Sequence, residues 1–299
     1  MEPERRLVSV VIPAYNAGWC VARAVDSALQ QTHAAREIIV VDDGSQDDTA
    51  AVLARYGDAV RVVHKLNGGL SSARNAGIAA ARVEYVALLD ADDSWLPGKL
   101  AAQVALMDSR PELGFCSVAA RVEDSQGRLL NLWPCPQWRG SFLEHLFREP
   151  AAVAASGSGV LVRRSLFERV GPFDEALASL EDIDMWMRLS AAAQYACVAE
   201  PLAVILKRAD SMSRNLDVMR DAAIRVMRKN RALLPERLRG AHWRDGLAGV
   251  FADYAKWQYR IGRRTDAVLD VMRAFALAPL SRGRLCLGLL RDMALGRPL

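Results

Sequence analysis

Residues 85–93 read Tyr-Val-Ala-Leu-Leu-Asp-Ala-Asp-Asp, an apolar run that ends in three carboxylates. The run Tyr85–Leu89 predicts a buried β-strand, because it is rich in large apolar side chains and too short for an independent helix. An extended backbone places Asp90 and Asp92 on the same side. Two carboxylates that close raise each other's pKa unless a cation lies between them, and Mg²⁺ or Mn²⁺ prefers such oxygen ligands. The alternative is a helix start, in which the last acids act as caps.

Strand and helix patterns alternate on both sides of this run. Strands are expected at residues 8–12, 37–41, 60–64, 85–89 and 115–120, with helices at 21–30, 47–56, 71–81 and 97–108. Such alternation predicts a Rossmann-like α/β fold, with a mostly parallel central sheet and helices on both faces. Ligands bind beyond the carboxyl ends of the strands in sheets of this kind. Polar side chains follow the strands at 8–12, 37–41 and 85–89.

The second half of the chain has a different pattern. Strands are expected at 129–133 and 159–163 and an amphipathic helix at 181–192, followed by helices at 216–234, 246–261, 265–277 and 285–295. We therefore expect an α/β domain over residues 1–214, with one half at about 7–121 and another at about 122–214. An all-helical C-terminal region is expected over residues 215–299.

The composition is that of a globular protein, with 52% hydrophobic and 25% charged residues among 299. No apolar run approaches the roughly 18 residues of a membrane-spanning helix, and the N-terminus has no signal-peptide pattern. The five cysteines are scattered without metal-ligand spacing, so we expect reduced thiols in a cytoplasmic protein.

The positive charge is concentrated at the C-terminal end. Residues 215–299 contain 17 Lys and Arg against 8 Asp and Glu, whereas residues 1–214 contain 22 against 27. One interpretation is a peripheral contact with an anionic membrane surface, at its inner face. The other is a set of solvated helix faces that carry distributed arginines. A nucleic-acid partner is not expected, because no recognised binding motif accompanies the charge.

Five segments occur in an order and spacing typical of a known family. They are VSVVIPAYN (residues 8–16), IVVDDGSQDDT (39–49), NGGLSSARNAG (67–77), YVALLDADD (85–93) and GPFDE with EDIDMW (171–175 and 181–186). Together they resemble glycosyltransferase family 2, the inverting nucleotide-sugar enzymes with the GT-A fold, over roughly residues 7–214. The resemblance makes residues 7–121 the nucleotide-binding half and residues 122–214 the acceptor half.

The resemblance implies a nucleotide-sugar site at the strand ends. Its residues are Pro13, Ala14, Tyr15, Asp43, Arg74, Asp90, Ala91 and Asp92. By resemblance, Asp43 accepts a hydrogen bond from the base, and Arg74 lies near the diphosphate or the acids of the Asp90-Ala-Asp92 (DxD) motif. Asp43 in an Asx turn, and an Arg74–Asp90 ion pair, are the structural alternatives. The implied cofactor is a divalent metal, Mn²⁺ or Mg²⁺, with Asp92 as first candidate ligand and Asp90 as second.

Asp182 matches the general base of the family. Inversion needs one base opposite the leaving phosphate, to take the proton of the acceptor hydroxyl. The alternative is an acidic cluster that favours the helix dipole, worth about 0.3–1 kcal/mol. Asp184 and Glu181 are assigned to that structural role, although Glu181 also remains a candidate on the acceptor side.

One position departs from the family pattern. Arg208 stands where relatives often carry a histidine, and an arginine is able to pair with a phosphate but not to ligate a metal. Strict dependence on a metal is therefore less secure here. Other acceptor-side candidates are Trp133, Trp138 and Ser158, and we expect at least one of the two tryptophans to be in the core.

The function expected from these residues is inverting transfer of a hexosyl or related sugar from a nucleotide-sugar donor to an acceptor hydroxyl. The family and the basic C-terminal region favour a lipid-linked or cell-envelope polysaccharide as acceptor. The alternative is a non-catalytic nucleotide-sugar binding module, which has no need of an acid at position 182. A dinucleotide-dependent oxidoreductase is disfavoured, because no Gly-x-Gly-x-x-Gly follows the first strand.

Overall fold

The structure, a computed structural model, describes residues 7–135, 137–138, 140–208 and 215–299. Contact density divides the chain into two compact units. The α/β unit comprises 1–142, 151–176 and 188–209, and the helical unit comprises 143–150, 177–187 and 210–299. The boundary expected at residue 214 adjoins 209–214, which lie outside the described residues.

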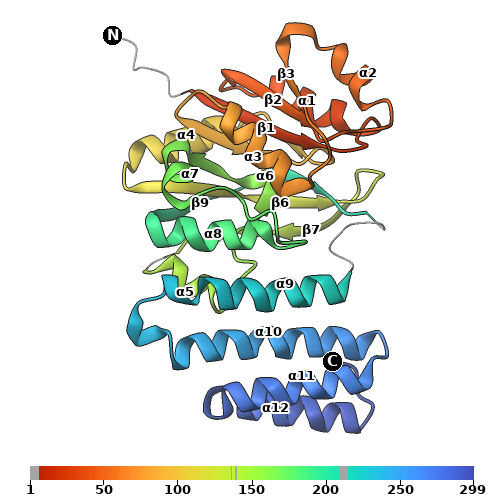
Figure 1. The fold of residues 1–299 in the computed structure, drawn as a ribbon, viewed down its shortest axis with the longest axis vertical. Coiled ribbons are helices and arrows are strands. Elements are labelled where there is room, and N and C mark those ends of the chain that lie inside the picture. Colours follow the sequence, from red (N-terminus) through yellow and green to blue (C-terminus); the bar gives the residue numbers. More distant parts are fainter. Residues whose placement is uncertain (1–6, 136, 139, 209–214) are drawn as a thin grey trace. The chain divides into compact units, whose positions relative to one another are not determined.

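The α/β unit is built around one sheet (Figure 1). Its strands are β1 (Val8–Ala14), β2 (Glu37–Asp42), β3 (Arg61–His64), β4 (Tyr85–Leu88), β5 (Ser94–Trp95), β6 (Leu113–Glu123), β7 (Leu129–Trp133), β8 (Leu161–Arg163) and β9 (Gln194–Leu206). Its helices include α1 (Val21–Leu29), α2 (Thr49–Ala54), α3 (Leu70–Ala80), α4 (Lys99–Ser109), α6 (Ser156–Gly159) and α7 (Arg164–Val170). Helices α5 (Phe142–Leu146) and α8 (Glu181–Ala192) are divided between the units.

The strand order β3-β2-β1-β4-β8-β6-β9-β5, with β7 paired to β6, confirms the expected α/β class. β1 to β4 pair in parallel, as do β6 and β9, whereas β8, β7 and β5 pair antiparallel with their neighbours. The long strand β9 was not expected from the sequence. It contains Pro201, which a ladder tolerates only at an edge or an irregularity, and the register of β9 against β6 shifts at that proline.

Alternating side chains of the central strands pack on two layers of helices. Val10 and Ile12 belong to the core cluster that also contains α1 and α4 residues. Val11 points to the other face, where α3 packs on β1 and β2. A Cβ built at Gly77 of α3 meets a Val11 methyl at 2.3 Å and a Val41 methyl at 3.2 Å, so the glycine permits this close approach.

The helical unit contains a series of four helices. They are α9 (Leu216–Lys229), α10 (Ala241–Arg260), α11 (Arg264–Leu277) and α12 (Pro279–Ala294), with short 3₁₀ turns at Asn230–Leu233 and Glu236–Leu238. α10 packs against α9, α11 and α12, which confirms the expected helical C-terminal region. α12 begins at Pro279 rather than near residue 285, because proline suits the first position of a helix.

No helix within the described residues combines the length and the apolar character needed to span a membrane.

Two of the five cysteines correct the expectation of free thiols throughout. Cys135 and Cys197 are joined as a disulfide, with their Cα atoms 5.9 Å apart, whereas Cys20, Cys116 and Cys286 are free and buried. The pairing was missed because 62 positions separate the two residues in the sequence and only the unexpected strand β9 brings them together. The bond ties the segment after β7 to the sheet.

Lys99, on the first turn of α4, is fully buried. Its ammonium lies 3.8 Å from the centroid of the Trp95 ring and has no hydrogen-bond partner among the described residues. Burial lowers the pKa of Lys99 to about 7, because desolvation disfavours the charged form.

Replacing Lys99 with methionine is expected to stabilise the protein most at or below pH 7. Between pH 7 and about 10.5 the unfolded chain holds a proton that the folded chain lacks, so wild-type stability rises with pH in that window. The Lys99→Met advantage, about 1–3 kcal/mol near neutrality, should therefore shrink toward pH 10. Thermal unfolding at several pH values checks this, with Lys207→Met, an exposed site, as control. An advantage that does not change with pH would contradict the assignment.

Candidate active site

The carboxyl ends of β1, β2 and β4 lie at one edge of the sheet, because β1 pairs in parallel with both neighbours. Ala14 pairs with Asp42, and the amide of Asp43 donates to the Ala14 carbonyl at 2.8 Å. The amide of Leu89 donates to the Val11 carbonyl at 3.1 Å, which extends the pairing to the end of the apolar run. The polar residues that follow the three strands therefore begin side by side.

The turn after β1 exposes an aromatic ring. Pro13 and Ala14 are buried within the strand, so only their backbone is able to face a ligand, whereas Tyr15 is 51% exposed. Asn16 has a φ of 48°, a left-handed conformation that asparagine tolerates, and its side-chain oxygen accepts from the amide of Gln46 at 2.8 Å. Asn16 thus fixes the turn to the loop after β2 through its side chain and, by donating its amide to the Ser45 hydroxyl, through its backbone. The exposed ring of Tyr15 is available for stacking.

Asp42, at the end of β2, makes its contacts within the chain. Its carboxylate accepts from the amide of Ser45 at 3.0 Å and contacts Nδ1 of His64 at 3.1 Å. These contacts join the turn after β2 to the end of β3.

Asp43, the residue expected to meet the base, is also engaged within the chain. Its carboxylate is 2% exposed and accepts from Nζ of Lys65 at 2.5 Å and from the amides of Gly68 and Gly69 at 3.1 and 2.8 Å. The side chain thus closes the loop that leads into α3. Its contact with a base stays a prediction. An ionised carboxylate has about four acceptor sites, so one remains for a base when three are used within the chain.

Arg74 and Asp90 form a partly buried ion pair at this edge. The Arg74 guanidinium, 2% exposed, donates to Oδ1 of Asp90 at 2.8 Å. It also lies 5.5 Å from the centroid of the Phe173 ring. The pair supports the structural alternative for Arg74, while the Asp90 side chain stays 30% exposed.

Gly157 makes room for this pair. A Cβ at position 157 would lie 2.5 Å from Nη2 of Arg74 and 2.5 Å from Oδ2 of Asp90. The backbone of α6 therefore approaches the two charged groups as only glycine allows.

Asp92 faces solvent beside two arginines. Its side chain is 38% exposed, and Oδ2 lies 4.0 Å from Nη1 of Arg208. Burial and the charge of Asp90 raise the pKa of Asp92, while Arg208 and Arg23 lower it. Arg23 donates to the backbone carbonyl of Asp92. The carboxylate is thus held between a like charge and two cations.

The Arg208 guanidinium stacks over an exposed tryptophan. Its carbon Cζ is 4.1 Å from the centroid of the Trp19 ring, and Trp19 is 55% exposed. The arrangement places Arg208 next to Asp92, consistent with its expected contact with a phosphate. A ring in cation–π contact with an arginine offers a flat surface at the same edge.

Asp93 and Ser158 are structural. The Ser158 hydroxyl donates to Asp93 at 2.5 Å and accepts from the amide of Asp90 at 3.1 Å, and the amide of Leu206 donates to Asp93 at 2.9 Å. Burial, with the nearby charges of Asp90 and Asp92, raises the pKa of Asp93 well above its usual range. Ser158 is fully buried, so the structure gives no support to its predicted place on the acceptor side.

The carboxylates at this edge fit a divalent metal in part. Within the described residues, no three His, Cys, Asp or Glu side chains gather as a ligand set. Asp92 and Asp90 offer two carboxylates, and a cation relieves the repulsion that raises the pKa of Asp92. Mg²⁺ and its relatives are commonly held by one or two carboxylates and completed by substrate phosphates. The donor set matches that arrangement.

Two distant motifs meet at Asn75. Its amide nitrogen donates to the Phe173 carbonyl at 3.0 Å and to Glu175 at 2.9 Å, and its oxygen accepts from the Phe173 amide at 2.7 Å. The Gly171–Glu175 segment is therefore fixed to α3, where it also places Phe173 beside Arg74.

The start of α8, which carries Asp182, belongs to the helical unit. Asp182 is partly exposed, and its carboxylate accepts from the amide of Ile183 at 2.7 Å. Leu180, just before the helix, has a φ of 57°, an unfavourable conformation for leucine that is often found at functional sites. Asp184 is fully buried and accepts from Lys229 and Asn230, as its structural assignment expects.

The two tryptophans proposed for the acceptor side are both exposed. Trp133 is 38% and Trp138 is 39% exposed, so the expectation that at least one is in the core is wrong. β7, which ends at Trp133, is exposed along its whole length because it lies at the margin of the sheet, where its one partner among the described strands is β6. Glu181, the remaining acceptor-side candidate, is 7% exposed.

Several residues of the site were not found from the sequence. Trp19 precedes α1 and Arg23 lies within it. Trp19 contacts Arg208, and Arg23 donates to the Asp92 carbonyl, only through the fold, so no local pattern reveals them. Lys65 precedes a Gly-Gly pair, and Gly157 lies in a Ser-Gly-Ser-Gly run. Such glycines signal close backbone approach, although not to which side chain.

The comparisons with known proteins agree with this architecture. The family model described as glycosyl transferase family 2 matches residues 9–171. An uncharacterised glycosyltransferase of Rickettsia prowazekii is 32% identical over 185 residues, which are 61% of this chain and 58% of the relative. The chain thus spans less than two thirds of that relative's length.

Solved structures share the fold. TarS of S. aureus (residues 1–349), solved with UDP-GlcNAc, matches with a TM-score of 0.69 at 19% identity over 97% of this chain and 92% of that one. The mannosyltransferase PcManGT of Pyrobaculum calidifontis, solved with GDP-Man and Mn²⁺, matches with a TM-score of 0.57 at 19% identity over 97% and 86%. The GT-A-like fold expected from the sequence is therefore confirmed.

Proposed function

Because this chain belongs to glycosyl transferase family 2, we propose that it is an inverting glycosyltransferase that moves a sugar from a nucleotide-sugar donor to an acceptor hydroxyl. The observation that carries the proposal is the charge arrangement at the carboxyl edge of the sheet. Asp90 and Asp92 lie there with Arg74 and Arg208. Two carboxylates and two guanidiniums suit a diphosphate that binds together with a cation.

The donor occupies the edge formed by β1, β2 and β4 in this proposal. Tyr15 stacks on the base, Asp43 accepts from it, and Asp90 meets the hydroxyls of the ribose or the sugar. Arg208 faces the diphosphate, where a guanidinium fork matches phosphate oxygens. Asp92, with Asp90 second, would hold a divalent Mn²⁺ or Mg²⁺, which when bound supplies Lewis-acid neutralisation of the leaving diphosphate.

The chemical step assigns one role to Asp182. Its carboxylate takes the proton of the acceptor hydroxyl as that oxygen forms a bond to the anomeric carbon of the sugar. The bond from the anomeric carbon to the diphosphate breaks, and its electron pair leaves with the nucleoside diphosphate. Attack on the face opposite the leaving group inverts the anomeric centre.

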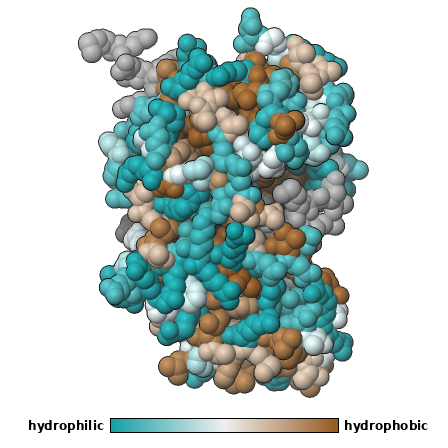
Figure 2. Space-filling model, viewed as in Figure 1, coloured by the Kyte–Doolittle hydropathy of each residue, from teal (hydrophilic) through white to brown (hydrophobic). Residues whose placement is uncertain are grey.

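The acceptor in this proposal is a saccharide of the cell envelope or a lipid-linked saccharide. The exposed rings of Trp133 and Trp138 offer surfaces for sugar stacking. The basic helical region supports peripheral contact with an anionic membrane. Its last two helices also expose apolar side chains, including Met272, Leu280 and Leu287, and Figure 2 shows hydrophobic patches on this part of the molecule.

Thermal unfolding in the presence of donors tests the proposal. UDP-, GDP-, dTDP- and CDP-sugars are added singly, with and without Mn²⁺. We expect one donor class to raise the unfolding midpoint, because a ligand that binds only the folded state stabilises it by mass action. A donor at about 100 times its Kd contributes roughly 2.7 kcal/mol. No rise with any donor would contradict nucleotide-sugar binding.

A further inference from the structure

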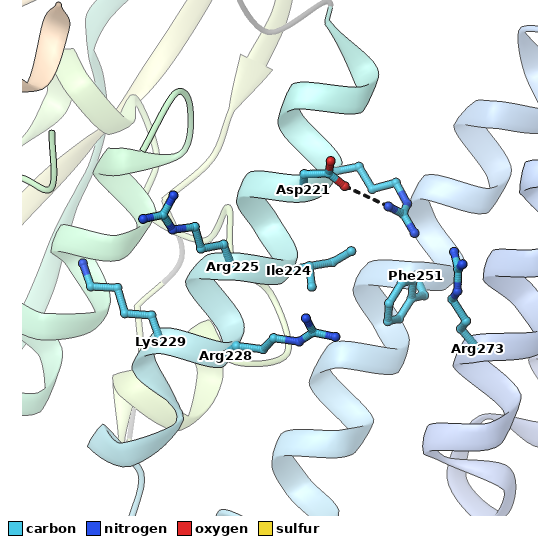
Figure 3. A pocket seen from close by; sticks show the side chains of 8 residues that line it. Asp221, Ile224, Arg225, Arg228, Lys229, Phe251 and Arg273 are labelled. Atoms are coloured by element: carbon cyan, nitrogen blue, oxygen red, sulfur yellow. Dashed lines mark hydrogen bonds and ion pairs between the residues drawn. The ribbon is translucent and has the colours of Figure 1, made fainter. Parts of the chain in front are cut away.

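The helical unit contains a basic cavity far along the chain from the strand-end motifs. It has a volume of about 800 Å³ and lies among α9, α10 and α11. Its lining residues are Arg220, Asp221, Ile224, Arg225, Arg228, Lys229, Phe251 and Arg273 (Figure 3). The volume is within the range of small-molecule sites.

A buried carboxylate fixes two of the arginines. Asp270 is fully buried and accepts from Nε and Nη2 of Arg220 at 2.6 and 2.7 Å and from Nη1 of Arg273 at 2.7 Å. Both guanidiniums lie over the Phe251 ring, 5.4 and 6.0 Å from its centroid. The arginines are thereby preorganised, which lowers the entropy lost on binding a ligand.

A third arginine, Arg228, lines the cavity beside Arg220 and Arg273. Arg220, Ile224 and Arg228 follow one another at four-residue intervals, so they share one face of α9. Figure 3 shows the Arg228 guanidinium pointing toward Phe251, whereas Arg225 and Lys229 extend from the other side of the helix. The Arg228 guanidinium has no hydrogen bond or ion pair to any part of the chain that the structure describes.

The charges on this face do not balance. Three guanidiniums, those of Arg220, Arg228 and Arg273, face two carboxylates, those of Asp221 and Asp270. All five N–H donors of the Arg228 guanidinium are unused within the described part of the chain, whereas Arg273 donates to Asp270. The ion pairs with Asp270 account for the positions of Arg220 and Arg273. They do not account for the Arg228 guanidinium, which points toward Phe251 in Figure 3.

We propose that this cavity binds a phosphate group. Planar guanidiniums match phosphate oxygens with paired N–H donors, and a preorganised set of arginines is the usual site for such an anion. The phosphate belongs either to a lipid headgroup or to a soluble phosphorylated molecule. The proposal concerns the helical unit and does not depend on the activity proposed for the strand-end site.

Titration of the full-length protein with inorganic phosphate at constant ionic strength tests the site. Calorimetry should show binding by the wild type and about a tenfold weaker affinity in Arg228→Gln, because one guanidinium fork is lost. Arg284→Gln, at an exposed arginine of α12 that does not line the cavity, removes the same charge and should leave the affinity unchanged. Equal affinities in the wild type and Arg228→Gln, or no binding at all, would overturn the proposal.

Vesicles distinguish the two sources of phosphate. Phosphatidic acid presents a phosphate monoester, and vesicles of phosphatidylserine at matched surface charge lack one. Tighter binding to phosphatidic acid that Arg228→Gln abolishes identifies a lipid headgroup. Equal binding to both vesicles, with phosphate affinity still sensitive to Arg228→Gln, identifies a soluble phosphorylated ligand. Both results support the cavity as a phosphate site.

Discussion

Asp182→Asn is expected to lower sugar transfer by at least about 10²-fold while donor binding stays unchanged. General base catalysis contributes typically 10²–10⁴-fold, and an amide of the same size is unable to take the acceptor proton. The backbone contact of the side chain, in which the Asp182 carboxylate accepts from the Ile183 amide, is one that the asparagine oxygen is able to replace. The helix should therefore persist.

The measurement is the release of nucleoside diphosphate in the presence of acceptor, together with the donor-induced shift in unfolding midpoint. If Asp182 serves only the helix dipole, the variant loses about 0.3–1 kcal/mol of stability and keeps its rate. Asp184→Asn is the matched control, because Asp184 is buried against Lys229 and Asn230. The Asp184→Asn protein should be less stable than the wild type but should retain sugar transfer. Unchanged turnover in Asp182→Asn would refute its assignment as base.

The second large effect is expected at Asp92. Asp92→Ala should lose the Mn²⁺-dependent part of donor affinity, at least about tenfold, because even outer-shell partners of metal ligands contribute 10–100-fold. The substitution also removes a negative charge 4.0 Å from Arg208 at the proposed diphosphate site, so the donor affinity without metal should change little or rise. Calorimetric titration with donor, with and without Mn²⁺, separates the two contributions.

Asp58→Ala provides the control for charge. Asp58 lies on the short turn Gly57–Ala59 before β3, at the amino end of that strand. The Asp58→Ala substitution removes one negative charge from the α/β unit without changing the acids at the strand ends. An Asp92→Ala protein with the same Mn²⁺ dependence as this control would show that Asp92 is not a ligand.

The strands of the nucleotide-binding half were predictable because their pattern is local. Short apolar runs such as Tyr85–Leu88 are bounded by turn residues, and the alternation with helices fixes parallel pairing. Parallel pairing brings the carboxyl ends of these strands together, so Asp43 and the Asp90-Ala-Asp92 segment were expected at one edge of the sheet. The register of β1 with β2 and β4 confirms that expectation.

What the sequence did not reveal depends on contacts between distant segments. β9 interrupts its apolar pattern with Glu200 and Pro201, and it forms because β6 offers a partner along its length. The Cys135–Cys197 disulfide and the burial of Ser158 follow from that pairing and from the packing of α6. A side chain such as Trp19 acquires its neighbour Arg208 only when the end of β9 returns to the edge.

Individual roles are harder to predict than positions. Asp42, Asp43 and Asp93 are all acids at strand ends, yet each is held by hydrogen bonds within the chain. Asp92 differs because its carboxylate remains exposed beside Arg208. Exposure and hydrogen-bond partners, which a sequence pattern does not encode, distinguish the exposed carboxylate of Asp92 from the three buried ones.

The most direct test of the account is the position of Mn²⁺ in crystals grown with the metal and a nucleoside diphosphate. Anomalous scattering locates the ion without reference to the rest of the map. We expect a peak at the carboxylate of Asp92, with diphosphate oxygens completing the ligands and Arg208 on the diphosphate. A peak away from the ends of β1, β2 and β4, or a diphosphate bound elsewhere in the protein, would contradict it.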